Sequence, residues 1–241
     1  MALPESELVT LPALRGALAP PAQCLVRWRP STRARRVSMR ICPREGAVVV
    51  ILPPRKGRRA GLALLTEHHE WVMERLAALA PMVHFTPDAL VLLGGRPHRI
   101  RHDPAARAGT FLDGDVIVVS GDPAFLRRRV GDFLRAEARR RISALVKPHA
   151  ATLGVKPGSI RLKDTRSRWG SCAPDGTLAF SWRLVMAPDW VLDYVVAHEV
   201  AHLRELNHSV RFWAHVAKLT VRREAAVEWL RLEGPALLRV G

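Results

Sequence analysis

The segment DWVLDYVVAHEVAHLRELNH, residues 189–208, combines an apolar helical pattern with three histidines and two glutamates. His198 and His202 are four residues apart, so on a helix both imidazoles lie on the same side and reach a single ion. Glu199 is rotated by about 100° from His198 and would lie beside that ion instead of binding it. This is the HExxH pattern of zinc hydrolases, in which the glutamate acts on a metal-bound water. We therefore expect a zinc site on this helix.

A catalytic zinc needs a third protein ligand and one open coordination position. His208 follows His202 by six residues. Asn207 tolerates the left-handed conformation that ends many helices, and a turn there would return His208 to the ion. Metzincins use the same six-residue step but have Gly where this chain has Glu205, which speaks against a metzincin. His208 is the ligand that we expect.

Two other kinds of ligand stay open. A carboxylate from the following segment, Glu224 or Glu228, would serve as in zincins with a distant glutamate ligand. Cys172 as a fourth ligand would close the site and leave Glu199 no water to act on. Three neutral imidazoles favour zinc over other divalent ions. We expect one Zn²⁺ per chain, held by three histidines.

Composition limits the class of protein. The chain has 241 residues, of which 48% are hydrophobic and 25% charged, as in a soluble globular protein. The longest charge-free stretch, residues 76–87, is 12 residues long and too short to span a membrane. The amino terminus has no basic region of a secretory signal, and the three cysteines have no CxxC spacing. We expect a cytoplasmic protein without membrane contact.

The net charge of +16 leaves two interpretations. Only five of the 38 basic residues are lysine, so the excess of arginine reflects either the coding bias of a GC-rich genome or contact with nucleotides or nucleic acid. A helix is predicted from residue 122 to 146, with Asp122 as its N-cap and Pro123 at its first position. The best nucleic-acid candidate is its basic face, formed by Arg127, Arg128, Arg129, Arg135, Arg139, Arg140 and Arg141.

The periodicity of apolar residues predicts a mixed α+β fold. Residues 1–22 are interpreted as a loosely attached leader. The first half is expected to be mostly β with one inserted helix, and alternation or helical spacing predicts strands at 37–41, 48–52, 90–93, 96–101 and 116–119 and a helix at 61–80. The second half is expected to be a helical, zincin-like catalytic half, with strands at 159–164 and 177–185 before the HExxH helix. The expected divisions are 23–120 and 121–235, within one structural domain over 23–235.

The segment Arg166-Ser167-Arg168-Trp169-Gly170-Ser171-Cys172 precedes the HExxH helix. Its arginines and serine are donors that would hold a substrate carboxylate, a phosphate or a developing oxyanion near zinc. Alternatively, the tryptophan packs under the metal helix and the arginines bind helix C-termini or acidic neighbours. Arg168 is the first candidate for a catalytic role.

Several segments together resemble the YgjP-like metallopeptidase family, a relative of the SprT-like and WLM zincins. The resemblance rests on the residues TRSRWGSC at 165–172, SWRL at 181–184, HEVAH at 198–202, NHS at 207–209 and FW at 212–213. It is dense from about residue 125 to 233 and looser over the first half. The resemblance implies a zinc-dependent hydrolase of the zincin type, with His198, His202 and His208 as ligands and Glu199 as base.

Three functions follow as hypotheses. The preferred one is a zinc metallopeptidase that cleaves peptides or unfolded protein, with Glu199 as general base and then general acid. The second is a metal-dependent nucleotide phosphohydrolase, a nucleoside triphosphate pyrophosphatase, in which arginines clamp the phosphates. The third is a DNA-associated protease or binding protein that docks through the basic face at residues 127–141.

Overall fold

A computed structural model describes residues 4–12, 22–107, 109–165 and 168–241. The chain divides into two compact units, Met1–Pro81 and Met82–Gly241, and each is described by itself. The boundary between the two units lies at residue 81, whereas the sequence analysis expected a division at residue 120. None of the helices in the described part of the chain is long and apolar enough to cross a lipid bilayer.

The first unit is a four-stranded sheet with two helices. Strand order is β1-β2-β4-β3, and β2 and β4 are parallel while the other pairs are antiparallel. Its elements are β1 (Ser6–Leu11), β2 (Ala22–Pro30), β3 (Ser38–Cys42), β4 (Ala47–Leu52), α1 (Arg58–Glu67) and α2 (His69–Ala77). The hairpin expected from the alternating residues around 37–52 is confirmed as β3 and β4.

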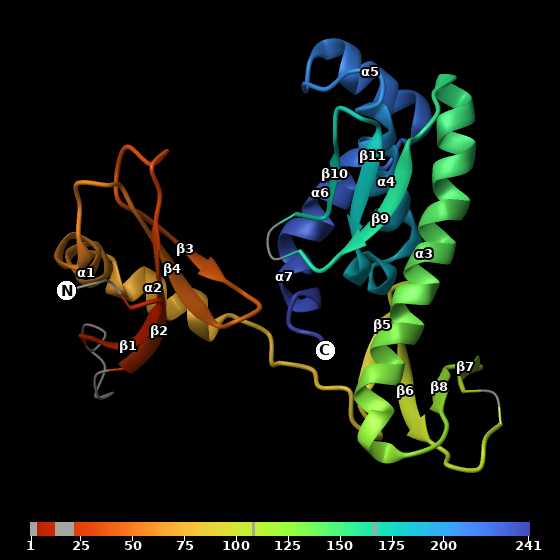
Figure 1. Ribbon diagram of the computed structural model, residues 1–241, viewed down its shortest axis with the longest axis horizontal. Coiled ribbons are helices and arrows are strands. Elements are labelled where there is room, and N and C mark those ends of the chain that lie inside the picture. The colour runs from red at the N-terminus through yellow and green to blue at the C-terminus, as the bar shows by residue number, and fades with distance from the viewer. Residues whose placement is uncertain (1–3, 13–21, 108, 166–167) are drawn as a thin grey trace. The chain divides into compact units, whose positions relative to one another are not determined.

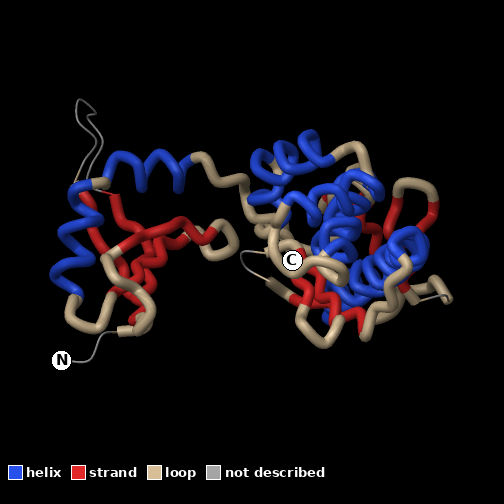
Figure 2. Tube along the Cα trace, turned by 90° about the horizontal axis from the view of Figure 1, so that it is seen from above, coloured by secondary structure: helices blue, strands red, loops and turns tan. Residues whose placement is uncertain are grey.

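Two expectations for this unit are wrong. Residues 6–11, expected in a loosely attached leader, form β1, in which Val9 and Leu11 are buried against β2. The helix expected at 61–80 is two helices, because His68 has a non-helical backbone (φ −112°, ψ 26°). Figure 2 shows the bend between them beside the strands. The bend lets Leu65 and Val72, both fully buried, join the same core.

The second unit contains two sheets. The first has the order β5-β6-β8-β7 and the second the order β10-β11-β9. The strands are β5 (Leu90–Leu93), β6 (Arg96–His102), β7 (Thr110–Asp113), β8 (Val116–Val119), β9 (Ser159–Lys163), β10 (Gly170–Cys172) and β11 (Thr177–Ser181). The helices are α3 (Leu126–Leu153), α4 (Asp189–Ala201), α5 (Val210–Leu219), α6 (Arg223–Leu232) and α7 (Gly234–Leu237), with 3₁₀ turns η1 (Pro123–Phe125) and η2 (Trp182–Met186).

Helix α3 joins the two sheets into one unit, since it runs past both of them (Figure 1) and contacts β8 and β9. Its buried side chains belong to one apolar cluster with Ile100 and Ile117 of the first sheet and Phe180 of the second. This shared core is the reason that residues 82–120 belong with the second half. Asp122 caps η1, accepting a hydrogen bond from Ala124 N, and α3 follows directly.

The strand expected at 177–185 ends at Ser181 and continues as η2. All five residues of η2 are buried, Arg183 among them, so the segment has no alternation of buried and exposed residues that would distinguish a strand from a buried turn. The chain passes from η2 into α4, in which nine of 13 residues are buried. The helix that bears His198 and Glu199 therefore lies inside the unit.

Candidate metal centre

Three imidazoles come together at the end of α4. His198 lies in the last turn of the helix, His202 is the residue after it, and His208 lies in the loop before α5. One ring nitrogen of each lies within 4.8 Å of the others, and the Nε2 atoms of His198 and His208 are 3.1 Å apart. The structure thus brings together three side chains that the sequence separates by four and six residues.

The loop after α4 returns His208 without a left-handed residue. Among the described residues other than glycine, only Asp88 has a positive φ, so the left-handed Asn207 that we expected is wrong. Instead α4 ends in a tighter turn, in which Leu203 N donates to the carbonyl oxygen of Val200, three residues earlier, at 3.0 Å. Asn207 acts through its side chain, whose Oδ1 accepts from Ser209 N at 3.0 Å, and Ser209 then caps α5.

The hydrogen bond of His202 determines which of its nitrogens is free. Its Nδ1 lies 3.0 Å from the carbonyl oxygen of Glu205. A carbonyl oxygen only accepts, so Nδ1 carries the proton and Nε2 keeps its lone pair. Such a bond to the second nitrogen is what orients metal-binding histidines in general.

Two aromatic side chains of α5 hold the imidazole rings in place. Phe212 is fully buried and stacks on His202, with ring centroids 4.4 Å apart. Trp213 stacks on His208 at 5.5 Å. Rings packed in this way lose rotational freedom, so the three nitrogens stay directed at one another.

Burial lowers the pKa of two of the imidazoles. The pKa of His198 falls from 6.5 to about 4, first because of burial and then because of the neighbouring His202 and His208. Burial also lowers the pKa of His202. Neutral imidazoles have a free lone pair at neutral pH and bind divalent metal ions that prefer nitrogen. The donor set therefore fits such an ion.

Glu199 lies beside this group and is enclosed by protein. It is 6% exposed, and burial raises its pKa from 4.5 to about 7. A carboxyl group whose pKa is near neutrality exchanges protons readily in both directions. Glu199 thus has the properties of a general base and acid.

The backbone of β10 passes directly over the Glu199 carboxylate. A Cβ atom placed on Gly170 would lie 2.4 Å from Glu199 Oε1 and 2.5 Å from its Cγ. Position 170 therefore has to be glycine for Glu199 to occupy its site. The sequence did not indicate this role, because only the fold brings residue 170 to residue 199.

Strand β10 is also an edge strand, paired only with β11 among the described strands.

The alternative ligands do not belong to the convergent group of ligand atoms. Glu224 is exposed on α6, and Glu228 forms an ion pair with Arg231 at 2.6 Å. Cys172 donates its thiol proton to Ala173 O and does not belong to the group of ligand atoms. Within the described residues, the group of ligand atoms that includes these histidines has three members.

The arginines near the site differ in position. Arg166 lies outside the described residues, and Arg168 is exposed two positions before Gly170. Trp169 packs against the start of α7, since a Cβ on Gly234 would lie 3.0 Å from its ring.

Arg223 is a residue near the site that the sequence did not indicate. Its guanidinium carbon lies 3.6 Å from the centroid of the Trp213 ring, and its charge contributes to the lowered pKa of His198.

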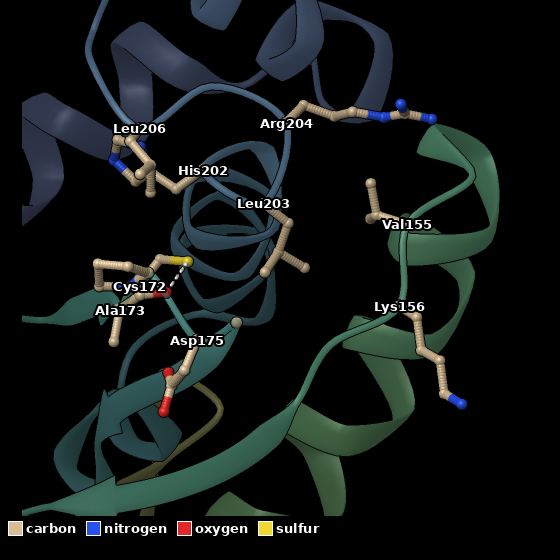
Figure 3. Close-up of a pocket in the computed structure, with 11 residues that line it drawn as sticks. Val155, Lys156, Cys172, Ala173, Asp175, His202, Leu203, Arg204 and Leu206 are labelled. Carbon is tan, nitrogen blue, oxygen red and sulfur yellow. Dashed lines mark hydrogen bonds between the residues drawn. The ribbon is translucent and has the colours of Figure 1, made fainter.

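A pocket of about 470 Å³ opens beside His202 (Figure 3). One wall is the turn between β10 and β11, and the others are the end of α4 with its loop and the segment after α3. Leu203 and Val155 form apolar parts of the lining. A group bound at the imidazoles would thus have room for a side chain next to it.

A buried carboxyl group next to three convergent imidazoles is the arrangement of a metal-dependent hydrolase. The profile of the family described as YgjP-like, metallopeptidase domain, matches residues 36–233. The chain therefore belongs to the YgjP-like metallopeptidase family.

Two further comparisons add little to this assignment. A crystal structure of the metallopeptidase zymogen of Pyrococcus abyssi abylysin is 20% identical and matches with a TM-score of 0.35, covering 39% of this chain and 92% of that one. No curated protein matches the chain.

Replacing His208 with alanine is expected to weaken metal binding by at least about 100-fold, because it removes one of three donors. Competition with a chromophoric zinc chelator measures this affinity. His68→Ala, which removes an exposed imidazole of the other unit, is the matched control. If Glu224→Gln or Glu228→Gln weakens binding and His208→Ala does not, the third ligand is a carboxylate.

Proposed function

We propose that this protein is a zinc-dependent peptidase of the zincin type, with one zinc held by His198, His202 and His208. The observation that carries the proposal is the buried Glu199, with a pKa near 7, beside three convergent imidazoles. A zinc ion bound there would polarise the scissile carbonyl and make water nucleophilic near neutral pH. The three free cysteines fit a reducing cytoplasm as its setting.

Glu199 performs the proton transfers of the proposed reaction. Its carboxylate accepts a proton from the attacking water, and the resulting carboxylic acid donates that proton to the leaving amine. A pKa near 7 suits both steps, because neither protonation state is strongly favoured at neutral pH. The backbone at Gly170 restricts the carboxyl group to one side of its pocket.

Strand β10 offers a place for the peptide. An edge strand has unpaired N–H and C=O groups, and an extended peptide adds to it as a further strand. Gly170 begins this edge immediately above Glu199, and Cys172 ends it at the pocket beside His202. A peptide paired with β10 would therefore pass the imidazoles and place one side chain in the pocket.

Two arginines are proposed to bind the substrate. Arg168 lies exposed just before β10, where a guanidinium would hold a carboxylate or carbonyl of the peptide. Arg223, stacked on Trp213, adds positive charge on the side of the imidazoles formed by α5 and α6. A guanidinium there would stabilise an oxyanion that develops on the scissile carbonyl.

Glu199→Gln is expected to lower kcat by about 10²- to 10⁴-fold, because the amide cannot accept the proton, while the zinc content stays at one per chain. Cleavage of fluorogenic unfolded protein and of a peptide library measures kcat, and elemental analysis measures zinc. If zinc-loaded wild type cleaves no peptide but releases phosphate from nucleoside triphosphates, the phosphohydrolase alternative replaces the peptidase.

Gly170→Ala is expected to lower kcat by about tenfold or more with little loss of zinc, because the methyl group would displace the Glu199 carboxyl group. Gly57→Ala is the control, since a Cβ there meets nothing within 4 Å. Peptide cleavage and zinc content are measured together. Unchanged kcat in Gly170→Ala would show that the position of Glu199 does not govern the reaction.

Arg223→Ala is expected to lower kcat by about tenfold or more, and Arg168→Ala to raise KM, because the first is assigned to the oxyanion and the second to binding. Steady-state peptide cleavage separates the two effects. Arg222→Ala, at the exposed neighbouring position, is the control. Equal kcat and KM in all three variants and wild type would remove both arginines from the reaction.

A further inference from the structure

Two loops of the first unit leave the sheet at the same end. Strands β2 and β4 are parallel, with Pro30 opposite Leu52 at their last residues. The segments that follow, residues 31–37 and 53–57, therefore begin side by side (Figure 1). Ser31 N donates to Leu52 O at 2.9 Å and joins the two at their base.

These loops and their flanks carry an unusual density of positive charge. Residues 29–36 and 55–59 contain eight basic side chains and no acidic one. Arg58 is paired with Glu7 at 2.6 Å. The other seven are exposed, and none of them has an ion-pair partner among the described residues. We call these seven the basic loop cluster: Arg29, Arg33, Arg35, Arg36, Arg55, Lys56 and Arg59.

A pocket of about 480 Å³ lies between the two loops. Arg29 and Arg33 line it together with the hydroxyl-bearing Ser31 and Thr32 and with prolines. Guanidinium and hydroxyl groups are the donors that bind phosphate oxygens, and the planar guanidinium does so in a bidentate manner. The lining contains no carboxylate that would repel an anion.

The basic face of α3, which the sequence singled out, is largely paired within the protein. Arg135 binds Asp132, and both Arg140 and Arg141 bind Glu137. Arg129 donates to the carbonyl oxygen of Ser120. On this face Arg127, Arg128, Arg129 and Arg139 have no ion-pair partner among the described residues. The basic loop cluster therefore offers seven charges without an ion-pair partner, against four on the face of α3.

The composition of the loops distinguishes among anionic partners. Neither range contains an aromatic residue on which an unpaired base would stack, and single-strand binding depends on such stacking. None of the exposed large apolar side chains lies in either range, so no anchor for a lipid interface is present there. With unpaired bases and a lipid interface disfavoured, the cationic side chains of the two ranges best fit a regular array of phosphates.

We propose that the basic loop cluster binds the phosphate backbone of duplex nucleic acid without reading its sequence. Seven cations on two adjacent loops and their flanking residues match a ligand of high, evenly spaced negative charge. Binding releases the counterions condensed on the duplex, so affinity falls steeply with salt. The proposal does not depend on the peptidase activity.

The test uses the full chain and a short fluorescent DNA duplex of arbitrary sequence, with affinity measured by anisotropy between about 50 and 200 mM salt. The variant R33Q/R35Q/R36Q is expected to bind at least about tenfold more weakly at 100 mM salt. Its slope of log affinity against log salt is expected to be smaller by about 2 to 3, since each phosphate contact contributes about 0.9. The matched control R127Q/R128Q/R139Q removes the same charge from α3 and is expected to retain most of the affinity.

Three results would overturn the proposal. The first is absence of duplex binding by the wild-type chain. The second is a loss in the α3 variant as large as in the loop variant, which would show that only net charge matters. The third is tighter binding of anionic lipid vesicles than of duplex, abolished in the loop variant, which would assign the cluster to a membrane surface. Thermal unfolding of both variants, with unchanged midpoints, shows that the substitutions act on binding and not on folding.

Discussion

The burial of the Glu199 carboxyl group together with the His198 imidazole is the constraint on which the site in the second unit depends. Removing these groups from water raises the pKa of Glu199 to about 7 and lowers that of His198 to about 4. Near neutrality His198 is therefore uncharged, and Glu199 changes its charge with small changes of surroundings. Burying polar groups without partners is unfavourable, and a bound divalent cation offsets that cost. The site and the fold are thus linked through the same burial.

The position of each group in this site comes from a different part of the unit. Helix α4 supplies His198 and Glu199, the loop after it supplies His208, and α5 supplies the rings that pack on the imidazoles. Strand β10 closes the site from the other side through the backbone of Gly170. Helix α3, packed on α4 and on both sheets, connects these parts through one continuous core. A shift in any of these elements would change distances at the site.

Positive charge is distributed unevenly over the protein. Many arginines of the second unit bind the protein itself: Arg204 donates to the carbonyl oxygen of Leu153 at the end of α3, and the buried Arg183 binds Asp164 and Val240 O. The seven side chains of the basic loop cluster in the first unit are exposed and have no ion-pair partner among the described residues. The net charge of +16 therefore does not indicate by itself which surface attracts anions.

The sequence by itself determined the features that repeat over a few residues. Helical spacing marked α3 and α4, alternation marked the hairpin β3–β4, and the HExxH spacing identified His198, Glu199 and His202 as one group. Only the tertiary structure decided the division at residue 81, the strand β1 and the places of Gly170 and Arg223 beside the site. The physical reason is the separation along the chain of the residues that interact. Periodicity reports contacts within one turn or one pleat, whereas these features arise where segments distant in sequence pack together.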